Sequence, residues 1–205
     1  MMIIPAKHQG KILDVNYDFA SESDIRLAKS WSVPEKYKNK PRIRDALEFS
    51  KLAINKLSYY QKHGCAATSA EDIKEYIQDN PRNEIAVCVV AKASWYKQSR
   101  ILGICLFRRT WCNNLIIDYL TAHPLSSEKG NTKISGIGSG FLYFVANNAM
   151  EIRANRVWGE ATQHSAGFYE KVLALKNVTD LILAKQKQVD TFKKFMDAKL
   201  KAQKR

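Results

Sequence analysis

Three apolar segments follow one another closely in the middle of the chain, and they constrain the fold more than any other feature. Residues 84–94, 100–110 and 115–122 are rich in Val, Ile, Leu and Cys, and short polar turns separate them. Connections this short join antiparallel strands, because a parallel pair needs a crossover of about a dozen residues. The segments therefore predict an antiparallel meander and exclude a doubly wound parallel sheet.

The rest of the chain shows the periodicities of further helices and strands. They predict strands over residues 11–19 and 156–162, and helices after Ser21, over 42–63, from 68 to 79, over 141–154, over 165–175 and over 186–203. Residues 181–185 fit either a strand or the start of the last helix. This order predicts an α/β fold of the α+β type, with a mixed, mostly antiparallel central sheet flanked by helices.

Length and composition set the outer limits. With 205 residues, of which 45% are hydrophobic, the chain can bury one substantial core. We expect one domain over residues 1–185, with a basic helix over 186–205 packed on it or trailing from it. No apolar segment is long enough to span a membrane, and the first residues do not resemble a secretory signal. Four cysteines without metal-ligand spacing favour a reduced, cytoplasmic protein with no structural metal.

The charge is strongly positive and unevenly distributed. The formal net charge is +13, and residues 171–205 carry ten lysines and arginines against three aspartates, a net +7. Such a field favours a polyanion such as nucleic acid, an anionic cofactor or an acidic partner. A solvated helix face that keeps the protein soluble explains it as well. Without a known nucleic-acid-binding motif, nucleic acid is possible as a partner but not favoured.

A glycine turn precedes the helix predicted after the meander. Gly136, Gly138 and Gly140 would let backbone N–H groups converge on a phosphate, to which the helix N-terminus adds partial positive charge. A dinucleotide motif would need glycine or alanine where Phe141 stands, although Glu160 lies where a ribose-binding acid would. A phosphate-binding P-loop is excluded because no Gly-Lys-Ser/Thr follows.

Coenzyme A is the other ligand that such a turn could hold, and here three motifs resemble one family. Lys133-Ile-Ser-Gly-Ile-Gly138 resembles the pyrophosphate loop of the GNAT superfamily of acyl-CoA N-acyltransferases. Leu120-Thr-Ala-His-Pro124 is similar to the end of that family's fourth strand, and Phe168-Tyr-Glu-Lys171 to a stretch of its following helix. The three motifs occur in the family's order, so the resemblance implies a GNAT-like fold and an acetyl-CoA co-substrate.

The chain also departs from the family pattern. Lys133 replaces the usual Gln or Arg, which keeps a cation near the phosphates. The stretch between Pro124 and Gly136 is about six residues longer than usual. Thr162 stands where the family often has asparagine, and the glycine that usually follows the last motif is missing from residues 172–175. These departures concern the contacts with pantetheine more than the fold.

The resemblance implies direct attack of an amine on the thioester, with no covalent enzyme intermediate. It makes Tyr169 the acid that protonates the leaving thiolate. The candidates for the base are Asp118, then Glu160, then His123 or His164. Strand alternation would place Asp118 on the face that also carries Ile116, Leu120 and Ala122.

The resemblance also implies which residues hold the cofactor. The backbone of the fourth-strand motif would pair with the pantetheine arm, much like an added strand. Lys129 would reach the 3′-phosphate of the adenosine. The residues expected to hold pantetheine and pyrophosphate are Leu120, Thr121, Ala122, Lys133, Ser135, Gly136, Ile137, Gly138, Ser139 and Gly140.

Several alternatives remain open at this stage. The amine acceptor could be a small molecule, a protein N-terminus or lysine, or an aminoacyl-tRNA, as in the small basic toxins of the family. A basic binding module that keeps the fold but has lost the chemistry is also consistent with the sequence. The protein could be a monomer or a homodimer.

Overall fold

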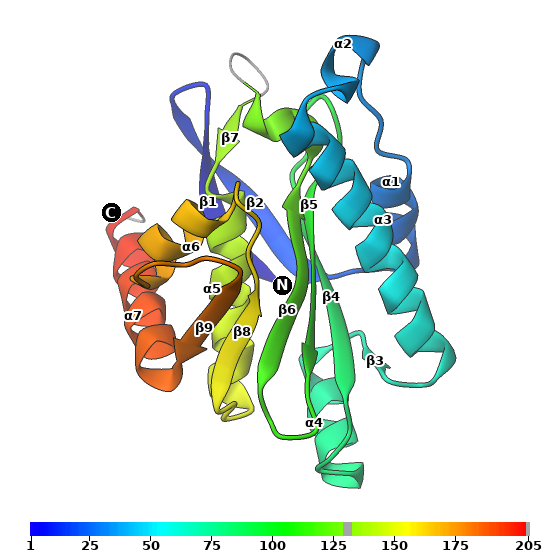
Figure 1. Cartoon of the computed structure of the whole chain (residues 1–205), viewed down its shortest axis with the longest axis vertical. Coiled ribbons are helices and arrows are strands. Elements are labelled where there is room, and N and C mark those ends of the chain that lie inside the picture. The colour runs from blue at the N-terminus through cyan, green and yellow to red at the C-terminus, as the bar shows by residue number, and fades with distance from the viewer. Residues whose placement is uncertain (129–132, 204–205) are drawn as a thin grey trace.

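The protein is built on one mixed sheet between two groups of helices (Figure 1). The computed structural model describes residues 1–128 and 133–203. The strands are β1 (Met2–His8), β2 (Lys11–Phe19), β3 (Ala66–Ala67), β4 (Ile85–Lys92), β5 (Ile101–Arg109), β6 (Leu115–Ala122), β7 (Ile134–Ser135), β8 (Arg156–Glu160) and β9 (Leu181–Lys185). The helices are α1 (Glu22–Lys29), α2 (Glu35–Lys38), α3 (Pro41–Lys62), α4 (Ala70–Asp79), α5 (Ile137–Glu151), α6 (Ala166–Leu173) and α7 (Gln186–Gln203), with the 3₁₀ turn η1 (Pro124–Ser127).

The strand order is β7-β1-β2-β4-β5-β6-β8-β9, with the short β3 beside β4. The predicted meander is confirmed, because β4, β5 and β6 pair antiparallel along their lengths. A long crossover runs from β6 through η1, β7 and α5 to β8, which lies parallel to β6. The predicted fold class is therefore confirmed as a mixed, mostly antiparallel sheet flanked by helices.

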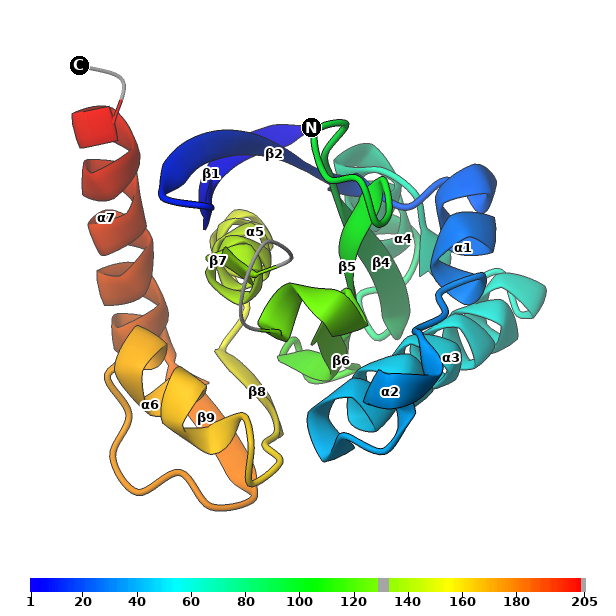
Figure 2. The same cartoon turned by 90° about the horizontal axis from the view of Figure 1, so that it is seen from above.

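The helices cover the two faces of the sheet in separate groups. In Figure 2, α1 and α3 lie on one face, while α5 lies on the other and is enclosed by α7 and the curled β1–β2 hairpin. Phe107 of the sheet, Phe141 of α5 and Phe192 of α7 belong to the core on the α5 face. A second core holds Leu57 of α3 against Ile104. Each such side chain contributes roughly 1.5–3 kcal/mol by leaving water, so the sheet is fixed from both sides.

The strand β6 changes its surroundings halfway along. Its first residues pair with β8, from Leu115 opposite Val157 to Ile117 opposite Gly159. The pairing with β8 ends there, and β6 continues to Ala122 bonded only to β5 on its other edge. Within the described chain, the second half of β6 therefore has one open edge.

A β-bulge marks this change and corrects the predicted alternation. Leu106 lies opposite Tyr119 and Phe107 opposite Ile117, so Asp118 has no partner across the β5–β6 pair. A bulge adds one residue to a strand and reverses the facing of the residues beyond it. Asp118 therefore lies on the α3 face, whereas Leu120 packs on the α5 core with Ala122. The expectation that Leu120 and Ala122 share one face of the sheet with Asp118 was wrong.

Some elements were missing from the sequence prediction or misplaced in it. The strand β1 was not predicted, although Ile4 and Ala6 on alternate positions are buried. The segment 123–135, expected to be a loop, contains η1 and β7 in its described residues. Residues 181–185 form a strand. The helix α4 takes its N-cap from Ser69, one residue later than predicted.

The C-terminal helix α7 lies against α5. Val189, Phe192 and Met196 on one face of it are buried in the same core as α5. None of the helices in residues 1–128 and 133–203 combines the length and the apolar composition needed to cross a membrane.

Candidate functional site

The helix α5 begins on a left-handed glycine. Gly136 is the N-cap with φ 108°, a conformation that glycine adopts without strain, and no side chain caps the helix. The first helical bond runs from the Gly140 N–H to the Gly136 carbonyl at 3.0 Å. The N–H groups of Ile137, Gly138 and Ser139 come before it and have no acceptor within the helix. Together with the helix dipole they form a site suited to an anion.

The other two glycines of the turn are required by packing, which differs from the role expected for them. A Cβ atom on Gly138 would come within 2.8 Å of the Phe168 ring, and one on Gly140 would overlap the Tyr17 ring. The Tyr17 hydroxyl also donates a hydrogen bond of 3.1 Å to the Ile137 carbonyl. Two aromatic side chains thus hold the turn in place, while its N–H groups remain available.

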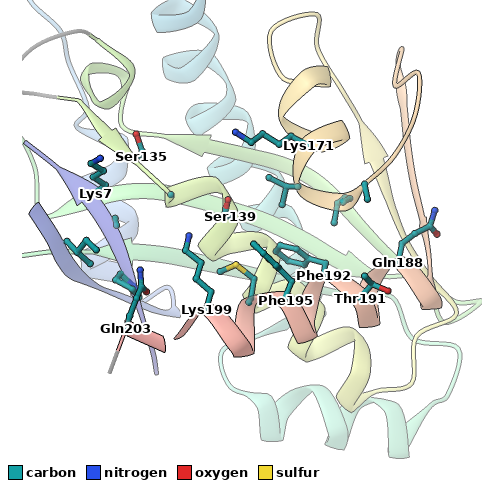
Figure 3. Close-up of a pocket in the computed structure, with 18 of the residues that line it drawn as sticks. Lys7, Ser135, Ser139, Lys171, Gln188, Thr191, Phe192, Phe195, Lys199 and Gln203 are labelled. Carbon is teal, nitrogen blue, oxygen red and sulfur yellow. The ribbon is translucent and has the colours of Figure 1, made fainter. Parts of the chain in front are cut away.

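A cavity of about 1100 Å³ adjoins this turn. Ser135, Gly136 and Ser139 line it on the turn side, and lysines from β1, α6, β9 and α7 line it as well (Figure 3). The Lys7 side chain comes from β1, and that of Lys199 comes from α7; the sequence prediction included neither. Because β1 itself was not predicted, no sequence signal connected Lys7 with the turn. Lys171 belongs to the motif Phe168-Tyr-Glu-Lys171, but the sequence analysis used it only for the family resemblance.

Tyr169 lies on the same face of the sheet as α5. Its side chain is 5% exposed, and within the described chain its hydroxyl has no hydrogen-bond partner. Burial raises the pKa of Tyr169, and the neighbouring Cys105 thiol raises this pKa further. Cys105 lies opposite Leu120 in the sheet, so Tyr169 is beside the open half of β6. The hydroxyl therefore stays protonated near neutral pH and can donate a proton.

The open half of β6 contains the residues expected to pair with pantetheine. Ala122 lies opposite Gly103 of β5, and Leu120 opposite Cys105, so their pairing with the sheet uses one edge of the strand. The Thr121 hydroxyl is directed to the α3 face, where it reaches the Ala46 carbonyl at 3.5 Å. The other edge offers backbone groups to an extended ligand, which is how a peptide-like chain adds to a sheet.

Asp118 is separated from this group. Its carboxylate accepts hydrogen bonds from Lys56 Nζ at 2.8 Å and from Arg108 Nε at 3.0 Å, and its side chain is only 7% exposed. Arg108 also lies 3.4 Å from a Glu84 carboxylate oxygen. These ion pairs lie on the α3 face, across the sheet from Tyr169. The carboxylate is thus part of a charge network that anchors the bulge to α3.

Glu160 has different surroundings. It ends β8, opposite Leu181, and is exposed. Because Val157 faces the α5 core, alternation along β8 directs Trp158 and Glu160 to the other face. Among the described residues no ion pair engages the Glu160 carboxylate. It lies just beyond the last pair between β6 and β8, where the two strands separate.

The two histidines also differ. His123 is 3% exposed, between the rings of Trp31 and Tyr96 at centroid distances of 5.2 and 5.7 Å. Its Nδ1 accepts a hydrogen bond of 3.3 Å from the Leu125 N–H. Burial lowers the pKa of His123 to about 4, so it is neutral at pH 7. His164 is exposed, in the turn before α6.

The remaining predicted residues lie before the turn. Lys133 is exposed, and its carbonyl accepts a hydrogen bond of 2.9 Å from the His8 ring. Lys129 lies outside the described residues. In the described part of the chain, no three His, Cys, Asp or Glu side chains come together as metal ligands would.

Comparison with known proteins gives structural matches only. No protein-family model and no curated protein sequence matches the chain. The chain is similar to a GNAT-family acetyltransferase from Staphylococcus aureus Mu50, with 11% identity and a TM-score of 0.47 over 84% of this chain and 99% of that one. It is also similar to the AtaT Y144F mutant toxin bound to the C-terminus of the antitoxin AtaR, with 10% identity and a TM-score of 0.45 over 86% and 95%.

A further match is a protein from Bacillus anthracis str. Ames described as a streptothricin acetyltransferase, in complex with acetyl coenzyme A. The identity is 17% and the TM-score 0.34 over 48% of this chain, and the match spans 60% of that chain's length. The solved structures that the chain resembles include GNAT acetyltransferases, and the strand order itself confirms the predicted mixed, mostly antiparallel sheet flanked by helices.

Proposed function

We propose that the protein is an N-acyltransferase that moves an acetyl group from coenzyme A to a primary amine. One observation carries this proposal: the N–H groups at the start of α5 that have no acceptor within the helix, the open edge of β6 and the Tyr169 hydroxyl all lie at one end of the sheet. The turn would hold the pyrophosphate, and Leu120, Thr121 and Ala122 would hold the pantetheine amides. Lys7 and Lys171 would add positive charge beside the phosphates.

The chemistry follows from this arrangement. The amine nitrogen attacks the thioester carbonyl, a C–N bond forms and the C–S bond breaks in the ternary complex. The Tyr169 hydroxyl gives its proton to the departing sulfur, so that coenzyme A leaves as a thiol. The nitrogen gives up its own proton to a base, and tyrosinate is reprotonated from solvent before the next turnover.

Glu160 is the base that the geometry supports best. No cation among the described residues pairs with the exposed Glu160 carboxylate, so it is open to a substrate, whereas two cations occupy the Asp118 carboxylate. Glu160 also lies on the face opposite α5, from which the amine could approach a cofactor bound on the α5 side. We therefore propose Glu160 as the base and a supporting role for Asp118.

The experiment that tests this function is an acceptor screen with acetyl-CoA labelled in the acetyl group. Small amines, peptides with a free N-terminus or lysine, and aminoacyl-tRNA are the three acceptor classes to compare. We expect label to enter one class, with release of an equal amount of free thiol. Without label transfer to any class and without acetyl-CoA binding, the proposal fails, and a non-enzymatic binding module becomes the better account.

The compartment is part of the same proposal. The four cysteines are unpaired, and a protein that keeps free thiols is typical of a reducing environment. We therefore propose a cytoplasmic location, where acetyl-CoA is available.

A further inference from the structure

The cavity beside the turn continues as a long groove along α7. Its lining residues on α7 extend from Lys187 to Gln203, which corresponds to about 24 Å of helix. The β1–β2 hairpin and the end of α6 form the opposite walls. A volume of about 1100 Å³ exceeds the range of roughly 300–1000 Å³ that small ligands occupy.

The groove has an apolar floor and a basic rim. Leu173, Phe192 and Met196 are buried at its base, while Phe195 and Ile12 at its edges are 64% and 60% exposed. Every charged residue that lines it is a lysine: Lys7, Lys171, Lys185, Lys187 and Lys199. Its occupant must accordingly combine an apolar face with negative charge.

The arrangement along α7 is regular. Lys187, Thr191, Phe195 and Lys199 follow one another at intervals of four residues, so they form one stripe on the helix surface. In Figure 3, Thr191, Phe195 and Lys199 follow one another along α7 beside the cavity. An exposed aromatic residue between two lysines matches an apolar anchor flanked by two acids on a facing helix.

Other occupants fit less well. A second copy bound groove to groove about a twofold axis would bring the same lysines against this rim, and like charges repel. A strand cannot extend the sheet cleanly at β1, because Pro5 has no N–H to offer. Single-stranded nucleic acid needs several exposed aromatic faces for base stacking, whereas Phe195 is the one exposed ring among the lining residues.

We propose that this groove docks an acidic, amphipathic helix of a partner protein. The apolar face of the partner helix would cover Phe195 and the floor, and its acids would meet Lys187 and Lys199. This inference does not depend on acyl transfer, because the groove lysines and the floor would serve docking in the absence of coenzyme A.

The test uses a fluorescein-labelled model peptide of about 18 residues, long enough to span the groove as a helix. It carries leucines at helical intervals of three and four, with glutamates beside them, and a scrambled peptide of equal composition serves as its control. We expect saturable binding of the first peptide by fluorescence anisotropy. The double variant Lys187→Glu with Lys199→Glu should weaken it at least about tenfold, and Phe195→Ser by about tenfold.

The matched control is Lys194→Glu with Lys201→Glu, which makes the same charge change on α7 outside the groove. It should change the affinity by no more than about threefold. Thermal unfolding verifies that each variant is folded. If the double variant Lys187→Glu with Lys199→Glu does not fold, the neutral double variant Lys187→Gln with Lys199→Gln takes its place. Absence of peptide binding, or equal weakening by both double variants, would overturn the proposal. So would groove-dependent binding of a labelled oligouridine without binding of the peptide.

Discussion

The two halves of β6 differ in what surrounds them, although they belong to one strand. The first half, up to Ile117, is bonded to β5 and β8 and is buried. The second half, beyond the bulge at Asp118, keeps β5 on one edge, and no strand of residues 1–128 and 133–203 pairs with the other. The first half supports the sheet, and the second half can bind an extended ligand. Changes around the open half should therefore affect activity, and changes in packed regions should affect stability.

The largest expected effect is on turnover, at the open half. Tyr169→Phe removes the proton donor and should lower kcat by about 100-fold or more, with little change in acetyl-CoA affinity. The measurement is steady-state kinetics with the acceptor found in the screen. Tyr143→Phe is the matched control, since the Tyr143 hydroxyl bonds Asp197 on α7, away from the turn. Equal rates for wild type and Tyr169→Phe would remove Tyr169 as the acid.

The next effect concerns packing beneath the turn. Gly140→Ala would push a methyl group into the Tyr17 ring and should lower the free energy of unfolding by about 3 kcal/mol. Gly167→Ala is its control in α6, where a Cβ meets nothing within 4 Å. That change should stabilise by roughly 0.5–1 kcal/mol, because alanine favours the helix. Urea unfolding measures both, and equal effects would contradict the packing role of Gly140.

A pH effect is expected from His123, which directly follows β6. Its pKa is lowered to about 4 by burial, whereas the unfolded chain has a value near 6.5. The unfolded state therefore binds the proton first, and stability falls as the pH drops from 6.5 towards 4. Between pH 7 and pH 5 we expect a loss of about 2 kcal/mol. Urea unfolding of His123→Asn should show a smaller loss, and an identical pH dependence would contradict this.

The smallest effect is expected at the bulge. Asp118→Asn weakens the ion pairs with Lys56 and Arg108, whose side chains are 33% and 19% exposed. Because asparagine keeps an oxygen that accepts a hydrogen bond, and both cations reach solvent, we expect a loss of only about 1 kcal/mol in urea unfolding. If Asp118 only anchors the bulge, the pH dependence of kcat should keep its shape. The acidic limb is the loss of rate at low pH that comes from protonation of the base. If Asp118→Asn lost this limb and Glu160→Gln kept it, Asp118 would be restored as the base.

The sequence was sufficient for the elements with strong local signals. The meander followed from apolar runs and short turns, and the Ser21 capping box marked the start of α1 as expected. These features depend on neighbours within a few residues. The turn was recognised for the same reason, since three glycines stand together before a helix.

The sequence could not give features that depend on distant contacts. The bulge at Asp118 arises from the register with β5, so alternation alone placed Leu120 on the wrong face. Glycine is required at positions 138 and 140 because the Phe168 and Tyr17 rings pack there, and both rings are distant from the turn in the sequence. The groove needs β1 and α7 side by side, and no local pattern connects the two ends of the chain.

The central claim is that the start of α5 binds the phosphates of coenzyme A, and isothermal titration with acetyl-CoA tests it most directly. Ser139→Glu places a carboxylate at this helix N-terminus, where it favours the fold but repels phosphate. Ser139→Gln is the neutral control of similar size. A Gly138 variant is unsuitable, because it would disturb Phe168.

We expect wild type and Ser139→Gln to bind acetyl-CoA with affinities within about threefold of each other, and Ser139→Glu to bind at least about 100-fold more weakly. Thermal unfolding of all three proteins should be similar. Equal binding by Ser139→Glu and Ser139→Gln, or no binding by wild type, would contradict a phosphate site at this turn.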